Sequence, residues 1–506
     1  MRRTSPLALA ATAAAVVASI AGAAFADVPI PNGPTSTLPS YVGSPATAQP
    51  VTGIPTIPQN PYMAPNGASS THNDSWQSDV YEGPGPLGKD PVLTSNGGFT
   101  GDCISPTFDR DGRVISICST PTEPGPKLKM FDPVTLDEIA SVNLPNRPAP
   151  LNGIPTLKDT SGGVYFYIDN ENRVVNVAPN NHVLRFTIEE DGFALETDFD
   201  VAAHLNTAYP AGDSPKQRLV SALPDWDGLI WFVTRYDGVV GTLNPETGVV
   251  QTLQLGDGLE NSIQNSFAID KKRAYVATNR RMLALEADED GRPVVQWSET
   301  YQNAGDVKPS QFDDGSGTTP TVLPGGFVAI TDNADPLNVV VYRTKKSKDQ
   351  VVCEVPVFGK GASANENSLI GVGNSLIVEN NHGYDVMGFQ TGAVRSKPGQ
   401  MRIDIDADKK GCHVVWANDQ VIPSVISKMS LATGLIYTYT RKVDENGVQG
   451  WYWTAVDYRT GETAFSVLAG TGPRWNNHYA AIAIGPDGTQ YTSGFPGGLW
   501  SMRDGS

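Results

Sequence analysis

Short runs of β-branched and aromatic residues dominate the hydrophobic pattern of the chain, and a helical period is nearly absent. Such runs recur along the sequence: VISIC, VYFYI, LIWFVT, AYVAT, FVAITD, LIVEN, LIYTYT and TQYTSG. Gly, Asp, Asn and Pro cluster between them, as is typical of strands that end in tight turns. The pattern predicts an all-β fold of many short strands, which is a sandwich, a barrel or a propeller.

A repeated unit decides between these architectures. Before most runs another apolar segment enters from a loop, and the eight segments start roughly 43 to 67 residues apart: GDCISPTF, LNGIPTL, RLVSALP, ENSIQNSFAI, GTTPTVL, ENSLIGV, VIPSVISKM and NNHYAAIAI. Several units continue with a third strand, a tight turn and a fourth strand, as in LNPETGVVQTLQL. Four strands per unit and eight units predict a single β-propeller with eight four-stranded blades, with seven blades as the alternative.

The ends of the chain fit the closure of a ring. The last unit supplies only GPDGTQYTSG and GLWSM before Ser506. We therefore expect its missing outer strand to come from the stretch near Val80 or from Pro91-Val92-Leu93.

One turn carries a family resemblance. The stretch AVDYRTGETAFSV, from Ala455 to Val467, resembles the A-x-D-x-x-T-G-x-x-x-W docking repeat of the quinoprotein-like (PQQ-repeat-type) β-propellers. LEADEDGRPVVQW, which ends at Trp297, is similar. In that family the tryptophan packs between blades, and Phe465 stands near its position here. The resemblance implies the fold and makes a PQQ-dependent dehydrogenase an alternative function, although the vicinal Cys-Cys pair of the alcohol dehydrogenases is absent.

The N-terminal region has the pattern of an exported protein. Arg2 and Arg3 precede an Ala/Val-rich stretch and the motif Ala24-Phe25-Ala26, which predicts a signal peptide over residues 1–26, with a membrane anchor as the alternative. Residues 27–75 are rich in Pro, Ser and Thr and predict a flexible segment, followed by the propeller domain over 76–506. No other stretch is long and apolar enough to span a membrane, so we expect a secreted protein.

The charge limits the choice of partners. The formal net charge is −17, and removal of the two leader arginines makes it about −19. Such an acidic chain repels phosphate backbones and anionic lipid, so we expect a small-molecule ligand and no nucleic acid. We also expect a monomer.

The cysteines predict two disulfides. An even number of cysteines in an exported chain favours pairing. Cys103 and Cys118 flank a turn at Asp109–Gly112 that brings them together, which leaves Cys353 to pair with Cys412 across neighbouring units.

The candidate site follows from propeller geometry. The loop before the first strand of a blade and the loop between its second and third strands open on one face, near the axis; we call this face the mouth. The tripeptide NNH occurs at 180–182, 380–382 and 476–478. ENS occurs at 260–262 and 366–368, in the segments ENSIQNSFAI and ENSLIGVGNSLI, which resemble two copies of one element. At least two NNH copies, both ENS copies and the acidic stretch Asp169–Asn172 are expected at the mouth.

Polar side chains at these positions form the predicted site. The predicted catalytic residues, which are also the tentative metal ligands, are Glu260, Glu366, His382 and His478. The predicted ligand-binding residues are Asn152, Asn261, Asn367, Asn476, Asn477 and Arg235. Carboxylate and amide oxygens suit Ca²⁺ or Mg²⁺, and two imidazoles shift the preference toward a transition metal. The alternative is structural, because Asn is favoured in turns.

Three hypotheses of function remain open at this stage. The first is an exported propeller that binds or acts on a small organic molecule at the mouth, with or without a divalent metal, as a hydrolase or lyase. The second is a quinoprotein-like oxidoreductase that uses PQQ. The third is a non-catalytic binding or scaffold propeller at the cell surface.

Overall fold

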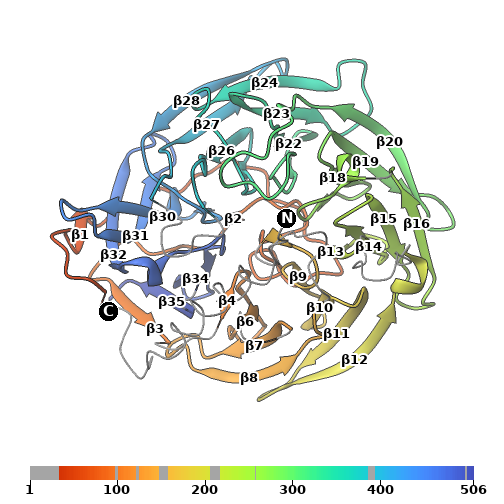
Figure 1. Ribbon diagram of the computed structural model, residues 1–506, viewed down its shortest axis with the longest axis horizontal. Coiled ribbons are helices and arrows are strands. Elements are labelled where there is room, and N and C mark those ends of the chain that lie inside the picture. Colours follow the sequence, from red (N-terminus) through yellow and green to blue (C-terminus); the bar gives the residue numbers. More distant parts are fainter. Residues whose placement is uncertain are drawn as a thin grey trace, which may run out of the picture.

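The structure is a computed structural model. It describes residues 33–96, 101–120, 123, 125–147, 158–205, 217–256, 258–385, 394–495 and 498–505. The predicted signal peptide and Asn152 lie outside these residues and stay predictions. The chain forms a ring of eight sheets around a central axis, as Figure 1 shows. The eight-bladed propeller that the repeat predicts is therefore confirmed.

Each blade runs from an inner strand at the axis to an outer strand at the rim. The first four blades are β4 (Asp102–Cys103), β5 (Thr107–Phe108), β6 (Val114–Ser119), β7 (Lys127–Phe131) and β8 (Glu138–Asn143); β9 (Phe166–Ile168), β10 (Arg173–Val177), β11 (His182–Ile188) and β12 (Phe193–Asp200); β13 (Leu219–Pro224), β14 (Ile230–Thr234), β15 (Val239–Leu243) and β16 (Val250–Gln254); and β17 (Ala268–Ile269), β18 (Ala274–Ala277), β19 (Arg281–Ala287) and β20 (Pro293–Thr300).

The second half of the ring repeats this arrangement. Its blades are β21 (Thr321–Leu323), β22 (Phe327–Thr331), β23 (Leu337–Arg343) and β24 (Val351–Val357); β25 (Ile370–Val372), β26 (Ser375–Glu379), β27 (Gln400–Ile405) and β28 (Cys412–Asn418); β29 (Lys428–Ser430), β30 (Leu435–Val443), β31 (Gln449–Asp457) and β32 (Thr463–Thr471), extended by β1 (Tyr41–Gly43) and β2 (Val80–Tyr81); and β33 (Ala483–Ile484), β34 (Gln490–Gly494) and β35 (Gly498–Arg503), completed by β3 (Val92–Ser95). The 3₁₀ helices whose bounds lie within the described residues are η2 (Ala202–His204), η3 (Leu259–Asn261) and η4 (Pro473–Trp475).

The ring closes between the two ends of the domain. Strand β3 pairs antiparallel with β35, with Leu93 opposite Met502, so the N-terminal region supplies the outer strand of the last blade. This confirms the expectation for the stretch Pro91-Val92-Leu93. The stretch near Val80 has another role, because β2 pairs parallel with β29, the inner strand of blade seven.

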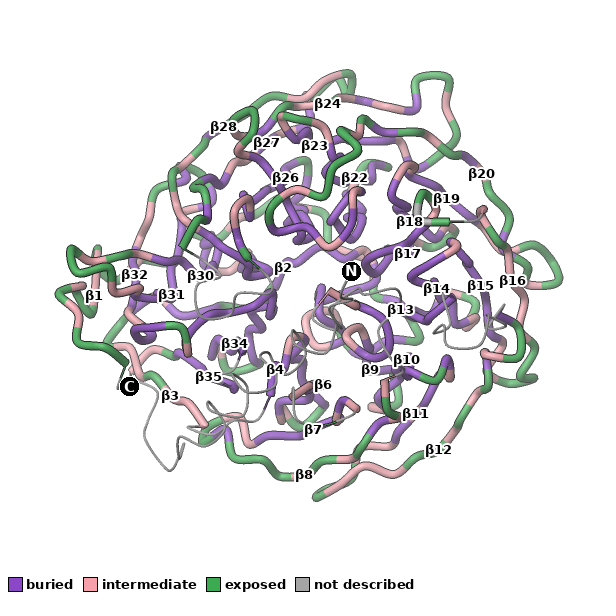
Figure 2. Tube along the Cα trace, in the orientation of Figure 1, coloured by how far each residue is buried: buried purple, intermediate pink, exposed green. Residues whose placement is uncertain are grey.

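The core lies between neighbouring blades. Figure 2 shows buried inner strands and a more exposed outer rim. Trp297 of blade four stacks on Tyr342 of blade five, with ring centroids 5.8 Å apart, and its indole N–H donates to the Thr344 carbonyl at 2.9 Å. Trp416 donates in the same way to the Tyr458 carbonyl of the next blade, at 2.8 Å. These contacts bear out the fold-level resemblance to the quinoprotein-like propellers.

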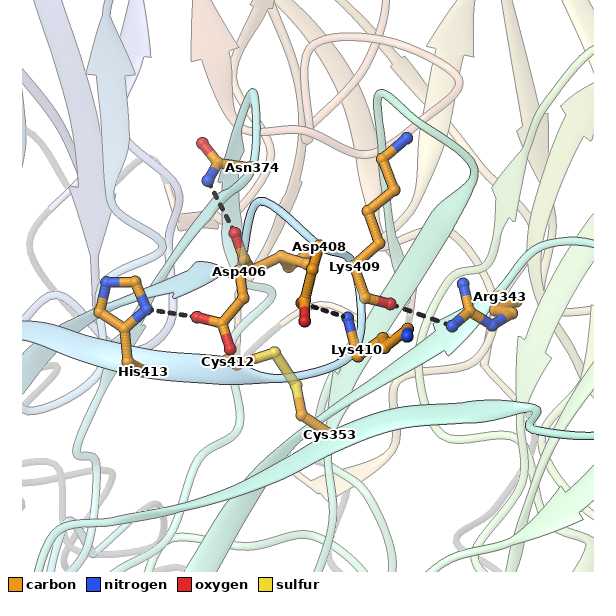
Figure 3. Close-up of a disulfide and its surroundings, with 10 residues drawn as sticks. Arg343, Cys353, Asn374, Asp406, Asp408, Lys409, Lys410, Cys412 and His413 are labelled. Carbon is orange, nitrogen blue, oxygen red and sulfur yellow. Dashed lines mark hydrogen bonds and ion pairs between the residues drawn. A yellow bond between two sulfur atoms is a disulfide. The ribbon is translucent and has the colours of Figure 1, made fainter.

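Both predicted disulfides are present. Cys103 and Cys118 are opposite each other in β4 and β6. Cys353 of β24 and Cys412 of β28 join the outer strands of blades five and six, as Figure 3 shows. The neighbouring DIDADKKG stretch forms the β27–β28 hairpin, in which Asp406 pairs with His413 at 2.7 Å.

The segment predicted to be flexible is packed against the propeller in its described part, residues 33–75. Strand β1 pairs with β32, with Tyr41 opposite Val467. Residues 60–81 follow the inner strands: the backbone oxygens of Ser69, Ser75 and Trp76 accept from the second, fourth and fifth blades. We call residues 60–81 the plug, and Figure 1 shows its strand β2 inside the ring. Polar composition did not prevent order because the ends of the inner strands supply partners for these groups.

The strand assignment of blade two differs from the prediction. The run VYFYI, expected to be a second strand, contains the inner strand β9. Asp169–Asn172 therefore form the turn between β9 and β10, on the face opposite the mouth. There the Asn172 side-chain oxygen accepts from the Arg110 backbone N–H of the equivalent turn in blade one, at 2.8 Å. The expectation that this acidic stretch lies at the mouth was wrong.

Among the described residues, no helix is long and apolar enough to cross a membrane.

Candidate functional site

A long loop between β20 and β21 covers the mouth of the channel. Residues 302–320, which we call the mouth loop, contact blades two, three, six and eight. The Ser310 carbonyl accepts from the Tyr479 hydroxyl at 2.8 Å, and the Gln311 carbonyl accepts from the Lys158 amine at 3.1 Å. The Phe312 backbone N–H donates to Glu366 at 3.3 Å. The mouth loop therefore spans the mouth between blades two, six and eight.

Glu366 lies beneath the mouth loop and is buried. Its carboxyl accepts a hydrogen bond from the side chain of Gln264 as well as from Phe312. Burial, and to a smaller extent the nearby Asp313 carboxylate, raise the pKa of Glu366 to about 8, although the hydrogen bonds from Gln264 and Phe312 oppose the change. Glu366 is therefore a proton-carrying acid at neutral pH, which is a state suited to general acid chemistry.

The two ENS copies are not equivalent, contrary to the prediction. Gln264 stands four residues before the inner strand β17, and Glu366 stands four residues before β25. The structural counterpart of Glu366 is therefore Gln264. Glu260 lies in η3, is exposed, and faces Arg280 at the rim. Its neighbour Asn261 accepts from Arg281 at 2.9 Å.

Arg235 is the buried cation of the mouth. Its side chain is fully buried and pairs with Asp313 of the mouth loop at 3.2 Å. Its guanidinium also donates to the Thr160 hydroxyl and to the Lys158 carbonyl, both at 3.3 Å. An arginine held on several sides in this way fixes the mouth loop against blades two and three.

His478 and Asp102 form a buried pair between the last and the first blade. His478 Nδ1 lies 2.7 Å from Asp102 Oδ2. Burial raises the pKa of the Asp102 carboxyl, and its hydrogen bond with His478 partly opposes this change. The Nε2 atom of His478 is buried and has no hydrogen-bond partner among the described residues. In the tautomer whose Nδ1–H donates to Asp102, Nε2 is the nitrogen that carries the lone pair.

The NNH turn that presents His478 has an unusual backbone. His478 has φ +46° and Tyr479 has φ +63°, a left-handed conformation that non-glycine residues rarely adopt. The Asn477 side chain holds the turn by donating to the Ala480 and Ser493 carbonyls and the Thr492 hydroxyl. Backbone strain of this kind is concentrated at functional sites.

The other two NNH copies occupy one equivalent position, the loop between the second and third strands. The side chain of Asn181 accepts from Leu219 and donates to the Gln217 carbonyl, which fixes the entry of the next blade. In the same way, the side chain of Asn381 accepts a hydrogen bond from the Glu366 backbone N–H and donates one to the Ile422 carbonyl. His182 lies at the rim and pairs with Asp198 at 2.5 Å.

The remaining predicted residues have mixed surroundings. His382 is half-buried; burial lowers its pKa first, and Lys397 and Lys308 lower it further. Asn367 donates to the Val425 carbonyl at 2.7 Å, and Asn476 accepts from the Tyr384 hydroxyl at 3.1 Å. In the part of the chain that is described, no three His, Cys, Asp or Glu side chains gather as a metal site would require. Glu260, Glu366, His382 and His478 thus do not form one cluster.

Sequence reasoning missed the buried groups contributed by the plug. Asp79 contacts Lys428 and Ser368, and His72 Nδ1 lies 3.0 Å from Asp79. These groups come from a segment whose composition is that of a linker. Asp102 was also missed, because its partner His478 is 376 positions away and no local motif marks it.

Comparisons with known proteins support the fold. No family model matches the chain. An uncharacterised protein from Archaeoglobus fulgidus is 26% identical over 388 residues, covering 66% of this chain and 73% of that protein. A quinohemoprotein alcohol dehydrogenase from Pseudomonas putida HK5 superimposes with a TM-score of 0.50 at 12% identity, over 87% of this chain and 80% of that one. A putative 6-phosphogluconolactonase from Bacteroides uniformis gives a TM-score of 0.39 at 13% identity, over 62% and 84%.

The resemblance to a quinoprotein fold raises the question of PQQ, which is a planar tricarboxylate. The described axial region has three buried cations, Arg218, Arg235 and Lys428. Each already pairs with a carboxylate, which is Asp159, Asp313 or Asp79 respectively. The carboxyl groups of Asp74 and Glu379 lie near Asp79, and that of Glu366 lies near Asp313 and Arg235. The residues present therefore do not fit a trianionic cofactor, and we derive no step through it.

Proposed function

We propose that this protein is an exported β-propeller that binds and acts on a small organic molecule at the mouth of its channel, with His478 exchanging a proton with that molecule. The observation that carries the proposal is the His478–Asp102 pair. Its geometry orients one imidazole nitrogen toward Asp102 and leaves Nε2 unpaired among the described residues. The two disulfides and the leader-like N-terminus support export.

The chemistry of this pair is that of a general base. Nε2 accepts a proton from a hydroxyl group, from water or from a carbon next to a carbonyl, and Asp102 stabilises the imidazolium that forms. Glu366, protonated at neutral pH because its pKa is about 8, is the complementary acid of the same face. The nearby Tyr384 and Tyr479 hydroxyls are engaged with Asn476 and Ser310, so they position neighbours.

Entry of a molecule requires the mouth loop to move. The central segment Ser310–Phe312 is held by hydrogen bonds to blades two, six and eight. The ion pairs Arg235–Asp313 and Arg280–Asp314 anchor the residues that follow it. Each of these contacts contributes modestly, so local opening costs much less than unfolding. We infer that substrate binding begins with displacement of Ser310–Phe312 from the mouth.

Metal assistance is a secondary part of the proposal. Glu366 and His478 are the predicted ligands that lie buried at the mouth. A bound substrate or water would have to complete their coordination, because the described residues supply no third ligand in one cluster. Elemental analysis of protein purified without chelator, compared with Glu366→Ala, tests this part separately.

A turnover screen tests the proposal. The mature protein is incubated with a mixture of hydroxy acids, lactones and ketones, and consumption of each compound is followed by mass spectrometry. Wild type and His413→Asn should consume the same compound, and His478→Asn should not. His413 is a matched control because it forms a 2.7 Å pair with Asp406 on the exposed rim. Equal consumption by both variants would remove His478 from the mechanism, and binding without turnover would favour the non-catalytic alternative.

A further inference from the structure

The plug meets blade seven at a buried lysine and a buried aspartate. Strands β2 and β29 pair in parallel, and Val80 lies opposite Met429. Asp79 and Lys428, each one position earlier in its own chain segment, therefore lie next to each other. Both side chains are 0% exposed, and the Lys428 amine contacts Asp79 Oδ1. The amine also donates to the Thr71 carbonyl of the plug. The register thus brings an amine and a carboxyl group into contact and removes both from water.

The surroundings contain proton carriers. His72 Nδ1 lies 3.0 Å and 3.2 Å from the two Asp79 oxygens, and the Ser368 hydroxyl donates to the same carboxyl group. Burial raises the pKa of Asp74 to about 7 and that of Glu379 to about 8, and both acids interact with Asp79. Buried acids that hold a proton near neutral pH can pass it to a leaving oxygen.

The two groups begin as an ion pair. Burial raises the pKa of Asp79, but Lys428 and His72 outweigh this and lower it overall. Burial lowers the pKa of Lys428, although Asp79 opposes this change. A fully buried ion pair loses its hydration, so proton transfer to give a neutral amine and a neutral acid costs less there than at the surface. A neutral amine held against a carboxyl group is a nucleophile next to its electrophile, with the high effective concentration of a fixed geometry.

We propose that Lys428 and Asp79 condense after folding into an amide bond that ties the plug to blade seven. The Nζ lone pair attacks Asp79 Cγ and forms the C–N bond. One carboxyl oxygen leaves as water, taking with it two of the three protons of the original ammonium group. His72, in contact with both oxygens, carries these protons to the leaving oxygen. No oxidant or external reagent is needed, since ammonium plus carboxylate equals amide plus water.

The bond would make the plug a covalent part of the ring. The plug crosses the inner strands of several blades through non-covalent contacts, which are hydrogen bonds and the packing of Met63, Val80 and Tyr81. A link at Asp79 closes a loop between the N-terminal region and blade seven, where β1 also pairs with β32. It complements the Cys353–Cys412 disulfide, which joins blades five and six at the rim.

Peptide mapping of the full-length exported protein tests the proposal. After reduction and alkylation, the wild type should lack the separate peptides containing Asp79 and Lys428 and should give one branched peptide lighter than their sum by about 18 Da, the mass of water. Lys428→Arg keeps the cation without an acylable amine and should give two unlinked peptides at full mass. Lys129, which pairs at 2.8 Å with the more exposed Glu138, should be unlinked in every sample.

The wild-type result decides the matter even if a variant fails to fold. Unmodified, separate peptides for Asp79 and Lys428 in the folded wild type would overturn the proposal. A water loss confined to one peptide, such as a succinimide, would overturn it as well. A His72→Ala variant that folds should form the branched peptide at least tenfold more slowly after refolding, which distinguishes proton transfer by His72 from simple proximity.

Discussion

His478 Nδ1 and Asp102 Oδ2 lie 2.7 Å apart and connect the last blade of the propeller to the first. The pair fixes which imidazole nitrogen carries the proton. In Asp102→Asn the side-chain amide can donate to Nδ1, so the proton should move to Nε2 and the base should be lost. We expect turnover to fall about 10³-fold or more, with the thermal midpoint nearly unchanged. Nitrogen-15 NMR of labelled histidine checks the tautomer, and an unchanged tautomer would contradict this account.

The buried acid at the mouth predicts a pH dependence of stability. The pKa of Glu366 rises from 4.5 in the unfolded chain to about 8 in the folded protein. The folded state therefore binds more protons between these values, and the free energy of unfolding should fall as pH rises from about 5 to about 8. Glu366→Gln should flatten part of this fall in chemical denaturation, whereas Glu260→Gln, at an exposed position, should not. Equal pH profiles for both variants would show that Glu366 is ionised when folded.

The docking tryptophan predicts a measurable stability loss. Trp297→Phe removes the indole donor and leaves the buried Thr344 carbonyl without that bond. We expect a loss of about 1–3 kcal/mol in the free energy of unfolding. Trp226, which is only half-buried, is the control, and Trp226→Phe should cost less. A smaller effect at Trp297 than at Trp226 would contradict its role between blades.

The disulfides should differ in their contribution. The Cys353–Cys412 bond spans 59 positions and joins two blades, while Cys103–Cys118 spans 15 positions inside one sheet. By loop entropy we expect the longer closure to contribute about 4 kcal/mol and the shorter about 3 kcal/mol. Paired Cys→Ser variants, unfolded with denaturant under non-reducing conditions, measure the two values. The reverse order would show that native-state contacts outweigh loop entropy.

The sequence predicted the ring well because its information is local and repeated. Strand runs recur with each blade and Thr-Gly turns with several of them, and the incomplete last unit indicated that β3 would close the ring. Cys103 and Cys118 were predictable because a hairpin places them opposite each other. Blade two was misread because VYFYI resembles any buried strand, and its inner position depends on contacts elsewhere.

The site was less predictable because its geometry is set by distant parts of the chain. Nothing near Asp102 indicates His478, and the plug has the composition of a linker although the inner strands order it. The repeated ENS motif suggested that Glu260 and Glu366 are equivalent. Counted back from the start of the inner strand, Gln264 is the structural counterpart of Glu366. Glu260 is exposed. Short motifs reveal a repeat, but strand register decides which side chains meet.

The central claim is that a small molecule meets the Nε2 atom of His478. The most direct measurement is NMR of imidazole-labelled protein while the compound consumed in the turnover screen is added. The account predicts a saturable shift of the His478 signals, with those of His413 unchanged, and loss of binding in His478→Asn. Saturable binding that leaves the His478 signals unmoved would place the site elsewhere and contradict the account.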